Sequence, residues 1–242
     1  MGIPSGPFRS DSRSKENRRT QNNPNRARYR KPIVGLAGGV GSGKSTVAKL
    51  LSELGAGIID SDALSRHEME SDEVRSTLRK WWGDDVISAD GSVVRPRVAA
   101  IIFGDSTQRH RLEALLHPRI AVRRNVLIDE YAAQPRIRMI VLDSPLLYET
   151  DLDLLCEAVV YVDAPLQCRS QRSEKQRNWP EGEVVRREKF QQGLDTKRAR
   201  ADYICSNNSS LADLRNEVER IFADILSKNE SPSAPSPRDD ND

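Results

Sequence analysis

The sequence predicts an α/β fold in which helices cover both faces of a central parallel sheet, giving three layers. Three observations lead to this prediction. A glycine-rich motif joins an apolar strand to a helix, short apolar runs alternate with helical patterns along the chain, and one long middle segment has helical patterns but no strand. Strands that alternate with helices are typical of a doubly wound sheet, which binds its ligand at the carboxyl ends of the strands.

The first strand is expected over residues 33–37, and residues 38–46 follow it with the pattern G-x-x-x-x-G-K-[ST]. Glycines let the backbone turn tightly, so that several N–H groups point at phosphate oxygens while Lys44 neutralises the β- and γ-phosphates. The helix expected over residues 44–54 adds its N-terminal dipole, and Ser45 would hold Mg²⁺. The dinucleotide pattern G-x-G-x-x-G fits less well, because Thr46 stands where its last glycine belongs. A P-loop NTPase-type nucleotide site is therefore predicted at Gly39, Val40, Gly41, Ser42, Gly43, Lys44, Ser45 and Thr46.

A second strand, over residues 57–59, leads into two aspartates, Asp60 and Asp62. If the chain stays extended there, both carboxylates point to one face, toward the phosphate loop. One of them could then accept a proton from an acceptor hydroxyl while the other orients water ligands of Mg²⁺. Asp62 could also cap the helix expected over residues 63–69, and capping does not exclude catalysis.

A helical insertion is expected next, because residues 72–131 contain no convincing strand of the sheet. Helices are predicted over residues 72–82, 95–103 and 108–131, with a small turn over residues 87–93. Trp81 and Trp82 point in two directions on their helix, so at least one ring packs. We interpret both as core residues rather than as a platform for a cofactor.

The second half of the chain continues the alternation of strands and helices. Strands are expected over residues 137–142, 159–162 and 203–205, and helices over residues 165–174, 181–191 and 211–226. Arg169 and Arg172 lie three residues apart on one of these helices and therefore on one face. Such a basic cluster is typical of a solvated face, or of a lid that brings arginines to a phosphoryl group.

Both ends of the chain differ from this body. Residues 1–31 carry nine Lys or Arg, two acidic residues and almost no apolar side chains, which predicts a disordered basic arm; residues 228–242 predict a disordered tail. The arm has few aromatic residues to stack on bases, so we interpret it as a solubilising leader rather than a nucleic-acid-binding segment.

Composition also excludes several classes of protein. No apolar run approaches the roughly 20 residues of a membrane span, and the polar N-terminus lacks the apolar segment of a secretory signal. Neither the three cysteines nor the three histidines have the spacing of a metal site or a disulfide framework. The chain of 242 residues, with a formal net charge of +2, is expected to be one cytosolic domain with no membrane partner. The sequence indicates no particular oligomeric state.

Five segments, taken in order, resemble the bacterial dephospho-coenzyme A kinase family. Residues 35–48 and 54–62 resemble the opening of that family, residues 115–120 its leucine-leucine-histidine-proline segment, and residues 142–149 its proline-leucine-leucine-aromatic-glutamate segment. Residues 197–204 with Asn207 resemble its C-terminal basic stretch. The resemblance extends over about residues 31–226.

The resemblance implies transfer of the γ-phosphoryl group from ATP to the 3′-hydroxyl of the dephospho-coenzyme A ribose, with Mg²⁺ as cofactor. It implies a kinase domain over residues 32–227, with the insertion at about 72–131 on the acceptor side and a lid at about 169–190. Asp62 would be the general base, assisted by Lys44 and Arg172. The acceptor would be bound by Asp60, His117, Pro145, Leu146 and Glu149, and the adenine of ATP would lie near Arg200 and Asn207.

Simpler interpretations stand beside these roles. His117 followed by Pro118 could form a helix kink, and Asn207 could be an ordinary turn residue. A kinase for another small acceptor, such as a nucleoside monophosphate, would share the fold. A GTPase switch would need the strings N-K-x-D and D-x-x-G, and neither occurs.

Overall fold

One parallel sheet organises the protein. The computed structural model describes residues 28–177, 179–180, 182–189 and 193–230. Its five strands lie in the order β2-β3-β1-β4-β5, and every neighbouring pair is parallel. They span Ile33–Gly38 (β1), Ala56–Asp60 (β2), Met139–Asp143 (β3), Ala158–Asp163 (β4) and Tyr203–Ser206 (β5). The predicted α/β fold with a central parallel sheet is confirmed.

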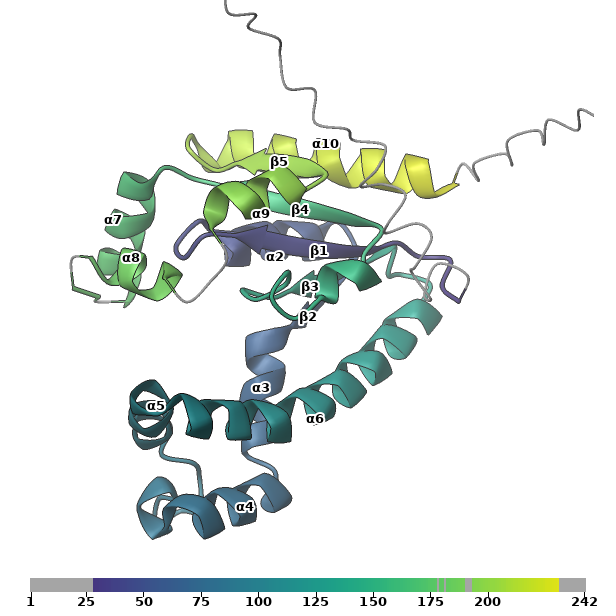
Figure 1. Ribbon diagram of the computed structural model, residues 1–242. Coiled ribbons are helices and arrows are strands. Elements are labelled where there is room, and N and C mark those ends of the chain that lie inside the picture. Colours follow the sequence, from purple (N-terminus) through teal and green to yellow (C-terminus); the bar gives the residue numbers. More distant parts are fainter. Residues whose placement is uncertain (1–27, 178, 181, 190–192, 231–242) are drawn as a thin grey trace, which may run out of the picture.

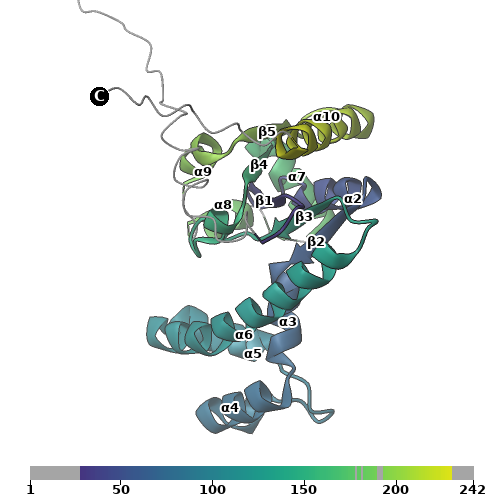
Figure 2. The same ribbon diagram turned by 90° about the vertical axis from the view of Figure 1, so that its right-hand side faces the viewer.

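Alternation along the strands gives the sheet two buried faces. On β1, Val34 and Leu36 join the core formed with α2 (Lys44–Glu53) and α10 (Leu211–Glu230). Ile33 and Ala37 point to the opposite face, where they pack with residues of the insertion and of the segment after β3. The layers are seen from two directions in Figures 1 and 2.

Between β2 and β3 the chain forms the expected helical insertion, which projects away from the sheet (Figure 1). It comprises α3 (Ser61–Met69), α4 (Asp72–Trp82), α5 (Arg95–Gly104) and α6 (Ser106–Ala133), with a 3₁₀ turn at Asp84–Val86. The insertion has its own apolar core, which includes Val74 and Leu78. Trp81 and Trp82 both pack against this core, in agreement with the interpretation made from the sequence. Pro118 lies inside α6, which continues through it.

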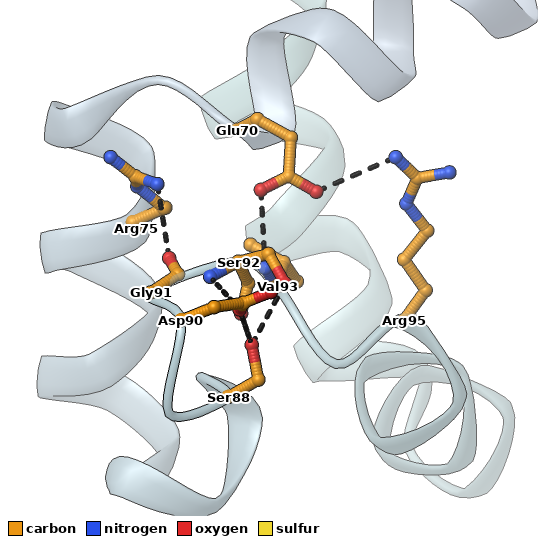
Figure 3. A network of polar contacts seen from close by, with 8 residues as sticks. All are labelled: Glu70, Arg75, Ser88, Asp90, Gly91, Ser92, Val93 and Arg95. Carbon is orange, nitrogen blue, oxygen red and sulfur yellow. Dashed lines mark hydrogen bonds and ion pairs between the residues drawn. The ribbon is translucent and has the colours of Figure 1, made fainter.

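A polar network closes the turn that precedes α5 (Figure 3). Asp90 accepts hydrogen bonds from the backbone N–H and the hydroxyl of Ser92, at 3.0 and 2.8 Å. Glu70, at the end of α3, accepts from the Val93 N–H at 3.1 Å and pairs with Arg95 at 3.4 Å. Because these contacts tie the α3–α4 junction to the turn before α5, they hold the insertion together as one packed unit.

The region after β4 differs most from the prediction. It contains α7 (Leu166–Arg177), α8 (Glu183–Glu188) and a helix that the sequence did not predict, α9 (Leu194–Arg200). α9 has no apolar periodicity, because its inward contacts come from cationic side chains. Residues 178, 181 and 190 of the expected lid lie outside the described residues, as does the end of the helix expected over residues 181–191.

The boundaries of the two terminal segments also shift. Arg28 pairs with Asp129 of α6 at 3.0 Å, and the Lys31 ammonium donates to the carbonyl of Tyr131 at 3.0 Å, near the C-terminus of α6, where cations are favoured. α10 continues to Glu230. Residues 28–31 and 228–230 therefore belong to the folded domain, whereas residues 1–27 and 231–242 lie outside the described residues. Within the described part, none of the helices has the length and apolarity needed to cross a membrane.

Candidate active site

The phosphate loop joins β1 to α2 through glycines that have left-handed backbone angles. Gly41 has φ +75° and Gly43 has φ +96°. A Cβ on Gly43 would lie only 2.2 Å from the side-chain nitrogen of Asn207, so no other residue fits there without a shift. The Lys44 ammonium folds back over the loop and donates to the carbonyls of Gly38 at 2.9 Å and Gly39 at 3.2 Å.

A cavity of about 450 Å³ lies at the carboxyl ends of the strands, directly over this loop. One wall carries acidic side chains from β2, α3 and β3, and the opposite wall carries residues of α7 and of the turn between β5 and α10. The lining residues that the sequence predicted are Val40, Gly41, Ser42, Gly43, Lys44, Ser45, Thr46, Asp60, Asp62, Pro145, Arg172 and Asn207. Lining residues that the sequence did not single out include Arg66, Ser173, Ser209 and Leu211.

The sequence predicted that Asp60 and Asp62 would share one face if the chain stayed extended after β2. The chain does not stay extended there. β2 ends at Asp60, whose carboxylate accepts from the Ala63 N–H at 2.9 Å and so caps α3. Asp62 lies in the first turn of that helix. The helix starts earlier than expected because Asp60 satisfies one of its unpaired N–H groups. Both carboxylates still reach the cavity, since α3 begins at its rim.

Asp143, the last residue of β3, brings a third carboxylate to the same wall. In the sheet it is paired with Asp60 on one side and with Leu36 of β1 on the other. The pKa of Asp143 is raised to about 6, mainly by burial. Lys44 contributes in the lowering direction, and the charges of Asp60 and Asp62 contribute in the raising direction. A carboxyl group with such a pKa, beside the phosphate loop, is a candidate functional residue. The sequence signal was its place at the end of a buried strand, but the order of the strands was needed to bring it to the loop.

On the opposite wall, Arg172 and Asn207 are tied to the phosphate loop. Arg172 donates to the backbone carbonyl of Asn207 at 3.0 Å and to its side-chain oxygen at 3.3 Å. The Asn207 amide in turn donates to the carbonyl of Ser42 at 2.7 Å. These bonds hold the α7 arginine and the β5–α10 turn at the nucleotide end of the cavity.

A buried ion pair from the expected lid also contacts this loop. Arg169 of α7 is 6% exposed, and its guanidinium donates to the Val40 carbonyl at 3.2 Å and pairs with Glu188 of α8. Glu188 accepts from the Val40 N–H at 2.9 Å. A carboxylate therefore occupies a loop N–H of the kind that binds phosphate oxygens.

Some predicted site residues lie outside the lining of the cavity. Gly39 contributes its carbonyl to Lys44. His117 is exposed on α6. Leu146 is 40% exposed, next to the lining residue Pro145.

Glu149 and Arg200 also lie outside the lining of the cavity, where both form ion pairs. Glu149 pairs with Lys197 at 2.8 Å. Arg200 pairs with the buried Asp153 at 2.8 Å and lies over the ring of Tyr148, with 4.3 Å between its guanidinium carbon and the ring centroid. It is the last residue of α9, and that helix directs it to the segment after β3 instead of to the cavity. The place of Arg200 near the adenine of ATP stays a prediction.

The chain is similar to known proteins of one kinase family. Residues 32–213 match the family model for dephospho-CoA kinase. The chain is 37% identical to a dephospho-CoA kinase of Corynebacterium glutamicum over 81% of its own length and 98% of the relative, and 34% identical to one of Thermobifida fusca over 79% and 95%. A solved structure from Thermus thermophilus superposes with a TM-score of 0.69 at 31% identity, covering 81% of this chain and 98% of that one. The dephospho-CoA kinase of Campylobacter jejuni has the same fold, with a TM-score of 0.60 at 20% identity over 82% and 99%. The chain belongs to the dephospho-CoA kinase family.

Proposed function

We propose that this protein transfers the γ-phosphoryl group of ATP to the 3′-hydroxyl of the dephospho-CoA ribose, the last step of coenzyme A synthesis. The observation that carries the proposal is the cavity that joins a phosphate loop to an acidic wall, in a chain of this family. The cytosolic location expected from the sequence is part of the same proposal.

The phosphate end of the cavity supplies alignment and positive charge. Phosphoryl transfer needs little covalent chemistry from the protein, because most of the catalysis comes from positioning and from neutralising charge on the transferred group. The loop N–H groups and the N-terminus of α2 would hold the phosphates. Lys44 would neutralise them from the loop and Arg172 from α7. Asn207, Ser209 and Leu211 would form the nucleoside end.

The acidic wall supplies the proton acceptor. The attacking ribose hydroxyl must lose its proton as it bonds to phosphorus, and we assign Asp62, at the rim of the cavity, as the general base. Asp143 is the alternative base, since its raised pKa of about 6 lies near the pH at which a base works best. Asp60 is committed to the cap of α3 and to Arg66, with which it pairs at 3.6 Å. We therefore do not assign it the role of base.

The donor atoms of the cavity fit Mg²⁺. The Ser45 hydroxyl and the three aspartate carboxylates present only oxygen, the ligand that Mg²⁺ prefers, and Mg²⁺ in kinases is held mainly by substrate phosphates and water. Among the described residues, no three His, Cys, Asp or Glu side chains are grouped so that they could hold a metal ion by themselves. Ser45 would hold the ion, which when bound neutralises charge on the β- and γ-phosphates.

The proposal is tested by incubating the purified protein with ATP, Mg²⁺ and, in separate reactions, dephospho-CoA, nucleoside monophosphates or shikimate. ADP release gives the rate, and mass spectrometry identifies the product. Only dephospho-CoA should be turned over efficiently. Faster phosphorylation of a nucleoside monophosphate would reject the proposed acceptor and leave a kinase of the same fold with another substrate.

A further inference from the structure

A buried lysine lies behind the cavity, and none of the roles above uses it. Lys197 of α9 is 1% exposed, and its ammonium pairs with Glu149 at 2.8 Å and donates to the backbone carbonyl of Pro145 at 3.0 Å. Removing an ammonium from water costs several kcal/mol unless it is paired and hydrogen-bonded. These contacts therefore compensate for its burial.

Both contacts are made to the segment that leaves β3 at the cavity. Pro145 lines the cavity and follows Asp143 by two residues. Further along, Leu147 and Tyr148 are buried in the apolar core. The apolar side chains thus anchor the middle of the segment, while Lys197 holds the carbonyl of a residue that lines the cavity.

α9 makes a second contact with the segment after β3. Arg200 lies one turn after Lys197 on α9 and pairs with Asp153 while covering the ring of Tyr148. Residues three apart share a helix face, so α9 presents two cations to one segment. α9 is also the first described element after α8 along the chain, and its two cations contact the segment that follows Asp143.

Stability alone is a poor reason for such a pair. Replacing a buried ion pair by apolar residues of similar volume is often neutral or stabilising, whereas an ion pair with a fixed geometry specifies one arrangement of the chain. Here the arrangement is that of the wall where the acceptor hydroxyl must meet Asp62 or Asp143.

We propose that Lys197 is a positioning residue for the acceptor: by holding the Pro145 carbonyl and the Glu149 carboxylate, it sets the wall of the cavity that orients dephospho-CoA. It does not touch the substrate. This inference rests on the proposed function, because it assigns a role within that reaction.

The test uses the full chain and the double variant Lys197→Met with Glu149→Gln. Changing both residues avoids leaving one buried charge without its partner, which by itself is strongly destabilising. Glu149→Gln alone keeps the lysine and its bond to Pro145. Arg215→Gln is the matched control, because Arg215 does not line the cavity and forms an exposed ion pair with Glu53, the last residue of α2, at 2.8 Å. For each protein, kcat, the KM of each substrate, ATP affinity by calorimetry and the melting temperature are measured.

The double variant should lose at least about tenfold in kcat/KM for dephospho-CoA, since a misplacement of about 1 Å can cost on the order of 10²-fold. Its KM for ATP, its ATP affinity and its melting temperature should stay close to wild type. Glu149→Gln alone should lose less kcat/KM, because the bond from Lys197 to Pro145 remains, but its melting temperature should fall because the buried ammonium loses its charge partner. The control should lose nothing. The selective effect on the acceptor is what a merely structural lysine would not produce.

Three results would overturn the inference. Unchanged kinetics for both substrates would show that Lys197 positions nothing, and equal losses for both substrates that follow a lower melting temperature would show a purely structural role. If the double variant does not fold, Lys197→Arg, which keeps both charges of the pair but changes the group that donates to Pro145, must show the loss confined to dephospho-CoA, and the absence of that loss rejects the inference. A wild-type protein that fails to phosphorylate dephospho-CoA rejects the proposed function itself, and this result is visible before any variant is compared.

Discussion

Replacing Asp143 by asparagine should stabilise the protein while impairing it. Burial raises the pKa of Asp143 from its usual value of 3.8 to about 6, with a lowering contribution from Lys44 and raising contributions from Asp60 and Asp62. A shift of about two pK units corresponds to roughly 3 kcal/mol between the charged and the neutral carboxyl group. The neutral amide introduced by Asp143→Asn avoids this cost, so roughly 3 kcal/mol is the largest gain in the free energy of unfolding to expect from the substitution.

The gain should depend on pH. Between the two pKa values the folded protein keeps a proton on Asp143 that the unfolded chain has lost, so the stability of the wild type falls as pH rises through this window. Below this pH window, the charge on Asp143 costs the wild type no stability. Near pH 5 the wild type has lost about half of the roughly 3 kcal/mol, and above about pH 7 nearly all of it. Urea unfolding at about pH 5 and about pH 8 measures the difference directly. At the higher pH the melting temperature of Asp143→Asn should exceed that of the wild type by up to roughly 6–12 °C.

A matched control is the aspartate that ends β4. Asp163 is partly exposed and pairs with Arg198 at 3.3 Å, so Asp163→Asn should change stability by less than about 1 kcal/mol and should not gain. If Asp143→Asn is no more stable than the wild type at the higher pH, or if its gain is the same at both pH values, the reasoning from burial fails. Turnover should fall in Asp143→Asn, because the cavity loses a carboxylate from the acidic wall.

Three further substitutions test the site. Asp62→Asn should lower kcat by on the order of 10²-fold with little change in ATP affinity or melting temperature, because the amide keeps the shape but cannot take a proton; near-normal turnover would move the base to Asp143. Asp60→Ala should cost about 1 kcal/mol of stability through the lost cap of α3, with Asp60→Asn retaining most of it, and equal melting temperatures for both variants would contradict the capping role. Glu188→Gln should lower the KM for ATP several-fold, which corresponds to roughly 1 kcal/mol of binding free energy, because it removes a carboxylate from the Val40 N–H and leaves Arg169 to attract phosphate. An unchanged KM would show that this contact does not compete with the nucleotide.

The most local features could be predicted from the sequence. Strands that are buried on both faces read as short apolar runs, and a loop that must fold around phosphates has glycines at fixed spacing whatever surrounds it. The phosphate loop from Val40 to Thr46, the five strands and the helical insertion therefore follow from short segments. Arg172 and Asn207 were predicted as site residues from the resemblance to a family, and the structure places both at the phosphate loop.

Features that depend on which segments meet could not be predicted in this way. Asp143 lies beside Asp60 and close to Lys44 because β3 inserts between β2 and β1, and no short segment records that order. α9 was missed because its helix is held by ion pairs with residues some 50 positions away, such as Lys197 with Glu149, instead of by an apolar stripe. The same long-range pairing engages Glu149 and Arg200 in ion pairs outside the lining of the cavity. The sequence by itself determined the loop that binds phosphate, because that chemistry is local; the tertiary structure decided which carboxylates and cations face it, because charge pairs form between segments that only the folded sheet brings together.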